Sequence, residues 1–489
     1  MSDSTKRNFI TKTTLVAALG GLLFGYDTSV ISGAVASIDH QLVRPLNLTN
    51  NWEDFISGFV IASALVGCML GSIISGFVAD FVGRKRGLFI SAILFVISAV
   101  GSAWPEYGII YPLHDPVAIV CSFIFYRIIC GIGVGIASTL APMYISEIAP
   151  ATIRGSLIIY YQIAIVSGQA GVYFVNWFIA SLGDHDWLMT TGWRIMLVSE
   201  IIPAFIFLLL LVPAVETPRW LMLKNRDEDA LKVLHNIFHP NEAHQTAAEI
   251  KSSLNKNIEL GSLFQFGAAA VLVGIGVAAF QQLVGINAVM YYAPEMFKNM
   301  GFGERGALFQ TIFVGVVTVI FCLIAMKMVD KVGRKPLLIV GSILQAIAML
   351  GLAATFMFKL NSMIAVFMIL FYCASFSISW GPMAWVLLAE LFPTAIKGRA
   401  MSLAVFIEWT VNLFVSWSFK IMDGNASLNA VFNHGFPFII YGIMGVLGTF
   451  FVIFFVPETK GRSLEEIQQI WLDRKNKKQM RNQIPVKAL

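Results

Sequence analysis

Charged residues and cysteines are both scarce in this chain. Only 13% of its 489 residues are charged, against roughly 25% in soluble domains, and 57% are hydrophobic. The five cysteines all lie inside apolar runs, and no two have the spacing of metal ligands. The composition therefore excludes an ordinary soluble domain, and it argues against a disulfide framework or a cysteine-based metal site.

A catalytic apparatus is missing as well. No nucleophile stands at a recognisable spacing from a base, and no soluble catalytic domain interrupts the apolar runs. The glycines of Gly131–Gly135 have a density typical of nucleotide-binding loops. They lie within an apolar run with no strand before it, however, so close helix packing explains them better. We expect no enzyme activity, no metal site and no nucleic-acid partner.

Long apolar runs are what the chain has in abundance. A helix that crosses a bilayer needs about 20 apolar residues. The sequence therefore predicts an all-α polytopic membrane protein of twelve helices, arranged as two pseudo-symmetric six-helix bundles with short cytoplasmic helices. The expected spans lie near 13–35, 55–79, 87–104, 119–141, 156–182, 194–213, 264–297, 306–328, 337–357, 363–388, 399–420 and 436–456.

A polar segment separates the two sets of six runs. We expect an N-terminal bundle over 1–213, a cytoplasmic helical linker over 214–260, a C-terminal bundle over 261–458, and a cytoplasmic helix with a disordered basic tail over 459–489. Amphipathic patterns predict short linker helices near 226–238 and 245–255. The first run is too long for a signal peptide and contains an acid, Asp27, so we expect it to remain as a helix.

Three short motifs occur twice, about half the chain apart, which indicates a tandem duplication. Of the 34 basic residues, 27 fall on the side that holds these motifs, the linker and both termini, so this side is expected to be cytoplasmic. The protein would then lie in the plasma membrane (the inner membrane of a bacterium). The motif pairs are Asp80–Arg86 with Asp330–Pro336, Glu147–Gly155 with Glu390–Gly398, and Glu216-Thr217 with Glu458-Thr459.

Acidic residues inside spanning runs are the sharpest functional signal. Asp27 lies deep in the first run, where an ionised carboxylate is costly, and Arg127 in the fourth run is an equally costly partner. The pair predicts a proton-coupling site; a permanent structural ion pair is the alternative. Glu200 and Glu408 are the other acids within spans, and each fits a proton relay, a cavity ligand or a packing residue.

Uncharged amides interrupt the seventh run at Gln281, Gln282 and Asn287, with Tyr291 just beyond. An amide donates to one hydroxyl and accepts from another, which suits a neutral polyhydroxy ligand. Hydrogen bonding between helices is the alternative. Trp385 and Trp409 add aromatic faces for the apolar side of a sugar ring, or serve as packing residues; Gln162 and Asn412 are lone amides in other runs.

The repeated charges predict a gate at the cytoplasmic ends of the helices. A salt-bridge network between the two halves would close that side and break when it opens. Topology signals alone are the alternative explanation. The candidate gate residues are Arg84, Glu147, Arg154, Glu216, Arg334, Glu390, Lys397 and Glu458.

An ordered set of motifs now points to a family. It comprises the two Gly-Arg-Lys loops, Glu216-Thr-Pro-Arg219, Gln281-Gln-x-x-Gly-Ile-Asn287, Gly381-Pro-x-x-Trp385 and Pro457-Glu-Thr-Lys-Gly461. Together they resemble the sugar porter family of the major facilitator superfamily, over about residues 13–472. The resemblance implies alternating access by two bundles, Asp27 and Arg127 as the coupling pair, and a sugar site lined by Gln162, Gln281, Gln282, Asn287, Tyr291 and Trp385, with Phe24 and Trp409 nearby.

Two positions depart from the family pattern. Thr318 stands where the family often has an asparagine, and Glu408 stands where its xylose–proton symporters have an amide. A carboxylate accepts from two hydroxyls but donates none when it is ionised, so hydroxyl selectivity is open at this position.

The resemblance implies proton-coupled import of a monosaccharide, with D-xylose as the expected substrate. It implies no cofactor beyond the proton, the lipid bilayer as surroundings, and a functional monomer. Facilitative carriers of the family usually lack an acid in the first helix, so Asp27 favours symport. An uncoupled facilitator is the alternative. A sugar-sensing receptor is a further one, disfavoured by a tail of only about thirty residues after residue 459.

Overall fold

The structure is a computed structural model that describes residues 3–108, 112–150, 154–255, 263, 268–392, 396–462 and 466–474. All regular elements of these residues are helical. Twelve helical segments within them are long and apolar enough to cross a membrane, which confirms the twelve predicted spans. The predicted disordered tail, 475–489, lies outside the described residues.

Six spans form the first half of the molecule. α1 is one span, α3 to α6 supply four, and α7 to α9 follow one another as a sixth that is interrupted at Ser199-Glu200. The helices of this half are α1 (Asp3–Val30), α2 (Val35–Ile38), α3 (Asn50–Phe81), α4 (Arg84–Ala103), α5 (Pro116–Ile148), α6 (Arg154–Ser181), α7 (His185–Trp187), α8 (Trp193–Val198) and α9 (Ile201–Leu211).

The second half repeats this plan with two broken spans. The seventh span breaks between α13 and α14, and the tenth between α17 and α18. Its helices are α13 (Ala268–Leu283), α14 (Ile286–Asn299), α15 (Glu304–Val332), α16 (Arg334–Met357), α17 (Ser362–Ile378), α18 (Trp380–Leu391), α19 (Lys397–Gly424), α20 (Ala426–Phe432) and α21 (Phe436–Phe455).

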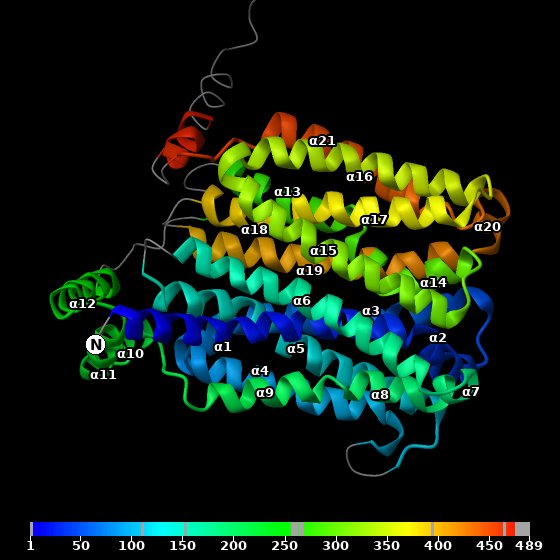
Figure 1. Ribbon diagram of the computed structural model, residues 1–489, viewed down its shortest axis with the longest axis horizontal. Coiled ribbons are helices and arrows are strands. Elements are labelled where there is room, and N and C mark those ends of the chain that lie inside the picture. Colours follow the sequence, from blue (N-terminus) through cyan, green and yellow to red (C-terminus); the bar gives the residue numbers. More distant parts are fainter. Residues whose placement is uncertain are drawn as a thin grey trace, which may run out of the picture.

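Three short helices join the halves: α10 (Pro218–Leu223), α11 (Asp227–Ile237) and α12 (Pro240–Asn255). Sequence patterns predicted α11 and α12 but not α10, which is only six residues long and begins with a proline after the Thr217 cap. One more helix covers 466–474. Figure 1 shows α10 to α12 beside the N-terminus at one end of the molecule, and α2, α7 and α20 at the other. We call these the basic end and the opposite end.

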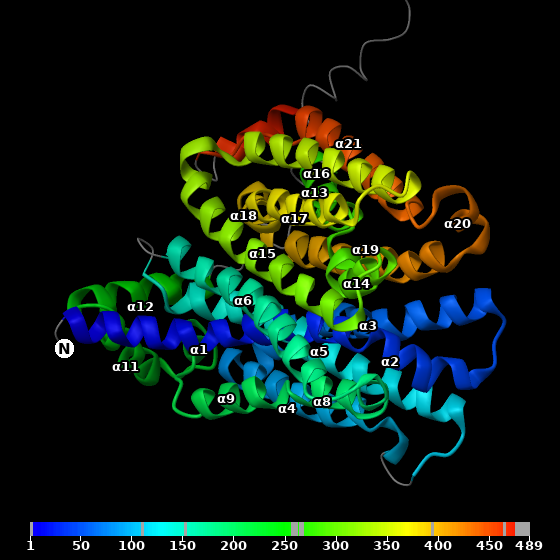
Figure 2. The same cartoon turned by 45° about the vertical axis from the view of Figure 1, so that its right-hand side comes forward.

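The two halves lie side by side, with α3 packed on α19 and α6 packed on α15 (Figures 1 and 2). Large apolar side chains such as Phe77 of α3 and Phe454 of α21 remain exposed on the outside of the bundle. An exposed apolar surface of this kind is what a bilayer covers.

The repeated motif builds the same helix start in both halves. Gly83 and Gly333 precede α4 and α16 with φ values of 103° and 102°, a conformation that glycine adopts without strain. The Glu216 carboxylate accepts from the backbone N–H of Arg84 at 3.0 Å and of Lys85 at 3.1 Å. Glu458 binds the start of α16 in the same way. Each glutamate thus caps a helix N-terminus from a distant part of its own half.

Candidate functional site

A cavity lies where the two halves meet. Its wall combines α1 and α6 of the first half with α13, α14, α15, α17, α18 and α19 of the second. Among the predicted substrate-binding residues, the lining includes Phe24, Gln162, Gln281, Gln282, Asn287, Trp385 and Glu408. Thr318, one of the two family departures, also lines it.

The break in the seventh span, at Gly285, brings the amides into this wall. Gly285 has a φ of 89°, and the ring of Tyr441 lies directly against it, so a side chain there would be strained and would clash. α13 therefore ends before the glycine and α14 starts after it. Gln281 and Gln282 at the end of one helix and Asn287 at the start of the next line the same cavity.

A directional hydrogen-bond chain runs through these side chains. Asn287 Nδ2 donates to Gln282 Oε1 at 2.8 Å, and Gln282 Nε2 donates to Glu408 Oε1 at 3.3 Å. Gln281 Nε2 lies 3.4 Å from the backbone oxygens of Trp380 and Gly381. Gln281 Oε1, Ser377 Oγ and Glu408 Oε2 are buried and have no partner among the described residues. Unpaired polar atoms in a concave wall are what a hydroxyl-bearing ligand satisfies.

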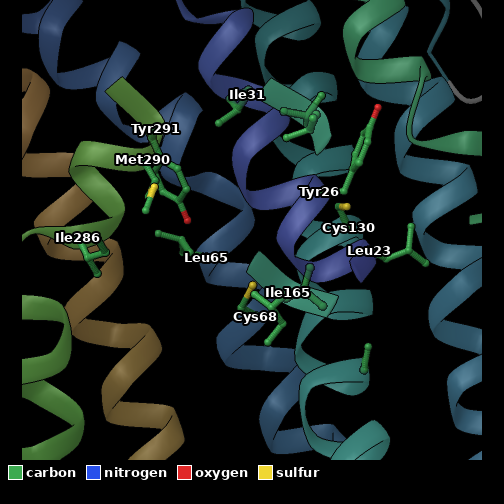
Figure 3. Packing of buried hydrophobic residues seen from close by; sticks show 14 of the residues in the cluster. Leu23, Tyr26, Ile31, Leu65, Cys68, Cys130, Ile165, Ile286, Met290 and Tyr291 are labelled. Carbon is green, nitrogen blue, oxygen red and sulfur yellow. The ribbon is translucent and has the colours of Figure 1, made fainter. Parts of the chain in front are cut away.

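The two remaining predicted substrate residues lie outside the lining. Trp409 is buried and packs edge-on against Phe24, with ring centroids 5.5 Å apart. Tyr291 of α14 is also buried, within electrostatic range of Asp27, Arg127 and Cys68. Figure 3 shows Tyr291 in the packed region that also contains Leu65 and Cys68 of α3. Tyr291 therefore lies beside the Asp27–Arg127 pair and does not line the cavity.

The charged cluster lies within the first half. Arg127 Nη1 of α5 is 2.6 Å from Asp27 Oδ1 of α1, and the two residues are 3% and 1% exposed. Glu200, 2% exposed, sits at the break between α8 and α9, with Cys130 Sγ 4.0 Å from its Oε1. One ligand-type atom each of Asp27, Cys130 and Glu200 lie within 4.8 Å of one another, and the cation beside them is the Arg127 guanidinium.

The charged residues of the basic end form ion pairs within each half in this conformation. Arg84 Nη2 is 2.9 Å from Glu147 Oε1, and Arg334 Nη2 is 3.1 Å from Glu390 Oε1. The predicted pairing between the halves belongs to a state in which this end is closed, so it stays a prediction.

Glu216, Arg154 and Lys397 are further charged residues among the predicted gate residues. Burial raises the pKa of Glu216, although the backbone N–H groups that it accepts from oppose the rise. Arg154 and Lys397 begin α6 and α19, and their side chains lie outside the described part of the structure. A gating role for the eight charged residues stays a prediction.

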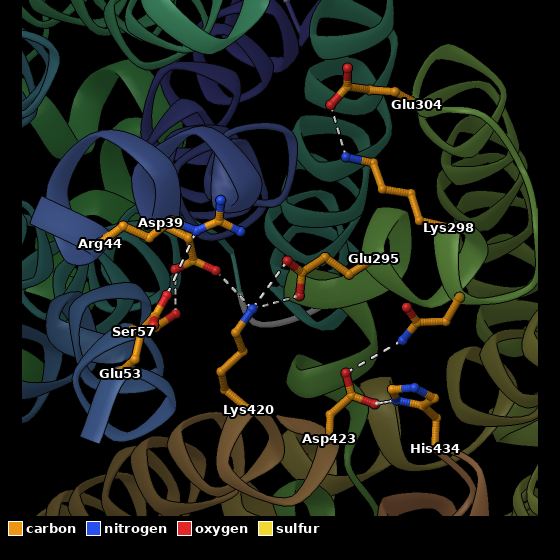
Figure 4. A network of polar contacts seen from close by, with 11 residues as sticks. Asp39, Arg44, Glu53, Ser57, Glu295, Lys298, Glu304, Lys420, Asp423 and His434 are labelled. Atoms are coloured by element: carbon orange, nitrogen blue, oxygen red, sulfur yellow. Dashed lines mark hydrogen bonds and ion pairs between the residues drawn. The ribbon is translucent and has the colours of Figure 1, made fainter. Parts of the chain in front are cut away.

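The opposite end holds a cross-half ion cluster that the sequence analysis missed. Lys420 Nζ of α19 is 2.8 Å from Asp39 Oδ2 of the first half, in the helical turn η2 (Asp39–Val43), and 3.2 Å from Glu295 Oε1 of α14 (Figure 4). Nearby, Trp417 Nε1 donates to the Phe55 carbonyl across the same interface at 2.9 Å. These contacts hold the halves together at this end.

Several lining residues also escaped prediction. Gln169 is an amide in the same apolar run as Gln162, so the same signal was available for it. The others are small, thiol or apolar side chains that carry no chemical signal in a membrane sequence: Ile165, Val166, Ile286, Met290, Cys322, Phe376, Ser377, Gly381 and Pro382.

Comparison with known proteins defines the family. The family model described as "Sugar (and other) transporter" matches residues 13–471. The chain belongs to the sugar transporter family. The D-xylose–proton symporter of Escherichia coli K12 is 48% identical over 96% of this chain and 97% of its own length. The glucose facilitated diffusion protein of Zymomonas mobilis is 43% identical over 97% of this chain and 100% of its own length.

Solved structures agree on the fold. An inward open structure of the xylose transporter from Escherichia coli superposes with a TM-score of 0.84 at 48% identity, covering 94% of this chain and 100% of that one. This sugar transporter family member therefore has the major facilitator fold, as the resemblance implied, and it is a multi-pass membrane transporter rather than an enzyme.

Proposed function

We propose that the protein imports a monosaccharide, D-xylose, together with a proton. The names of its relatives support a sugar substrate, but they divide on coupling: the Escherichia coli symporter uses a proton, whereas the Zymomonas mobilis protein is a facilitator. The coupling must therefore be argued from the chain's own site.

The buried cluster of Asp27, Arg127 and Glu200 carries the proposal. With both acids ionised it would hold a net charge of −1 among side chains that are at most 3% exposed. An uncompensated buried charge is expensive, so the cluster holds a proton on one of its acids. Loss or gain of that proton changes the attraction between Asp27 and Arg127. The cluster can therefore couple proton binding to movement of the helices.

The cluster is linked to the cavity by helices that serve both. Asp27 lies one turn after Phe24 on α1, and Phe24 lines the cavity. On α14, Asn287 lines the cavity and Tyr291 lies one turn later, within electrostatic range of the charged pair. Protonation of Asp27 weakens its attraction to Arg127, which frees α1 to move against α5 while sugar occupies the cavity.

The contacts between the halves at the opposite end indicate which side of the membrane the cavity faces in this conformation. Lys420 and Trp417 tie the halves together there, whereas the two arginine–glutamate pairs of the basic end each lie within one half. We assign the basic end, and with it both termini, to the cytoplasm, because it carries most of the Lys and Arg residues. The structure is then an inward-facing state of a monomer in the inner membrane, surrounded by lipid.

The energetics suffice for accumulation. At a proton-motive force of roughly 150–200 mV, one proton supplies ~3.5–4.6 kcal/mol. That supports a sugar gradient of ~10²–10³-fold. The cavity supplies the other requirement, since its amides and unpaired oxygens suit a neutral sugar and the Trp385 face suits the apolar side of the ring.

Accumulation and exchange distinguish this proposal from a facilitator. In energised vesicles, the wild type is expected to concentrate D-xylose, whereas Asp27→Asn equilibrates it without concentrating it. Counterflow of labelled D-xylose, which needs no proton gradient, is expected to persist in the variant. Accumulation that survives in Asp27→Asn would contradict the proposal and leave Asp27 as a structural charge.

A further inference from the structure

Glu408 differs from every other buried acid of the spanning helices described above, because no cation accompanies it. It is 4% exposed and lines the cavity from α19. Gln282 hydrogen-bonds to it, and no Arg, Lys or His of the described residues forms an ion pair with it or lines the cavity. Asp27 has Arg127 and Glu295 has Lys420, so Glu408 stands apart.

The surroundings of Glu408 favour the neutral form of its carboxyl group. Donors run in one direction, from Asn287 to Gln282 and from Gln282 to Glu408 Oε1, so Oε1 acts as an acceptor. Oε2 is buried with no partner. A carboxylate buried without a cation costs several kcal/mol in a membrane interior, whereas a carboxylic acid removes that cost by carrying a proton on Oε2.

We propose that Glu408 is a second proton-carrying residue, which binds the sugar as a neutral carboxylic acid. Its Oε2–H then donates to one sugar hydroxyl, while its Oε1 accepts from Gln282. A neutral acid has the donor and acceptor pattern of a carboxamide, so it fits a neutral sugar. An ionised Glu408 loses the donor and places an unpaired charge beside the ligand, which weakens binding. This inference rests on the proposed sugar cavity but not on proton-coupled transport.

The surroundings of Glu408 leave few other groups to explain a pH effect on binding. Tyr161 of α6 is in electrostatic range, and Cys322 of α15 lines the same cavity. Among the helices packed against α19, α13 carries no titratable residue. Cys68 of α3 and Tyr291 of α14 face the Asp27–Arg127 pair instead. Tyr441 of α21 packs against Gly285, and Glu390 of α18 pairs with Arg334 at the basic end.

The sign of the pH effect follows from linkage. If the sugar binds the protonated form, its affinity is constant below the pH at which Glu408 ionises in the empty protein. Above that pH the dissociation constant rises, by up to about tenfold per pH unit for one proton taken up. Binding of one sugar then consumes one proton from solution.

The test measures D-xylose binding by calorimetry on the full-length protein between pH 5 and 9, in buffers of different ionisation enthalpy. An Asp27→Asn background removes the coupling acid. In this background the dissociation constant is expected to rise with pH and close to one proton to be taken up per sugar at alkaline pH. Adding Glu408→Gln, which keeps the shape and a donor, is expected to make the affinity independent of pH and proton uptake zero. Cys322→Ser tests whether the thiol in the cavity contributes to the pH dependence. The matched control is Glu228→Gln on the exposed face of α11, which keeps the pH dependence.

A dissociation constant that stays flat with pH in Asp27→Asn, with no proton uptake, overturns the inference. So does a pH dependence that persists after Glu408→Gln. A protein that binds D-xylose in no variant is titrated with D-glucose and L-arabinose in the same assay. If one of these binds, the substrate assignment changes, and the role of Glu408 is still tested by the pH dependence of that sugar's binding. If none binds, the proposal that this cavity binds a sugar is contradicted. Loss of accumulation in the wild type affects the proposed coupling alone.

Discussion

The two halves of this transporter share a scaffold but hold different chemistry at the level of the cavity. The first half places Asp27, Arg127 and Glu200 in a buried charged cluster. The second half supplies Gln281, Gln282 and Asn287 to the cavity wall, and the described residues that line this cavity include no Lys, Arg or His. At the basic end, by contrast, both halves build the same capped helix start and the same arginine–glutamate pair. The duplicated motif kept the scaffold, while the middle of the halves diverged into a buried charged cluster in one half and an amide-rich cavity wall in the other.

The largest expected effect tests that difference between the halves directly. Gln282→Leu removes the central link of the amide chain and leaves Asn287 Nδ2 and Glu408 Oε1 without partners. Because Gln282 lines the cavity, the variant also loses an amide that would donate to one sugar hydroxyl and accept from another. Each hydrogen bond lost to the sugar costs about 1–3 kcal/mol, so binding of D-xylose should weaken by roughly 10²-fold or more. Calorimetry on purified protein measures it. Asp27→Asn, in the charged cluster, should stay within a few-fold of the wild type in the same assay, and equal losses in both variants would break the comparison.

A second prediction concerns the cross-half cluster. Lys420→Ala leaves the carboxylates of Asp39 and Glu295 facing each other without a cation, which should open the opposite end. Spin labels at the exposed positions Trp52 and Val431 should move apart in double electron–electron resonance. Lys298→Ala is the matched control because Lys298 pairs with Glu304 inside the second half. If the distance between the two spin labels does not change in Lys420→Ala, the Lys420 cluster does not hold the opposite end closed.

A smaller effect should be equal in the two halves. Glu147→Gln and Glu390→Gln each replace the carboxylate that pairs with the arginine of one repeat. Each should lower the thermal unfolding temperature by about 2–4 °C. Differential scanning fluorimetry compares them, with the surface variant Glu228→Gln of α11 as control. A strong effect on one side only would show that the two copies have diverged at the basic end too.

The smallest effect is a pH dependence at the opposite end. The hydrogen bond to Asp423 raises the pKa of His434 above its ordinary value near 6.5. Its contribution to stability is therefore full below about pH 6.5 and is lost as pH rises through the raised pKa. For this partly exposed pair the contribution is at most ~1 kcal/mol. The difference in unfolding temperature between wild type and His434→Gln should shrink from pH 5.5 to pH 8.5. A difference that grows with pH would reverse the assigned sign.

Sequence reasoning found the features that stand out against an apolar background. Asp27, Arg127 and the amides near Gly285 are conspicuous because each is costly in a membrane unless it is used. The length of the apolar runs made the twelve spans predictable. The basic-end motifs were predictable because each occurs twice, about half the chain apart.

Other features were beyond reach for physical reasons. Lys420, Asp39 and Glu295 occur once each, at helix ends where charges are ordinary, so nothing in the chain pairs them. The partner of Arg84 depends on which helices pack together and on the conformational state, and in this state it is Glu147 of the same half. Met290 and Phe376 line the cavity with the same side chains that face lipid elsewhere.

External pH on addition of sugar is the most direct test of the central claim. Energy-depleted cells that express the protein are suspended in weak buffer, and D-xylose is added. The account predicts a transient alkalinisation of the medium that is absent in cells expressing Asp27→Asn. No pH change in the wild type, despite measurable exchange of D-xylose, would contradict it and make the protein a facilitator with a structural ion pair at Asp27.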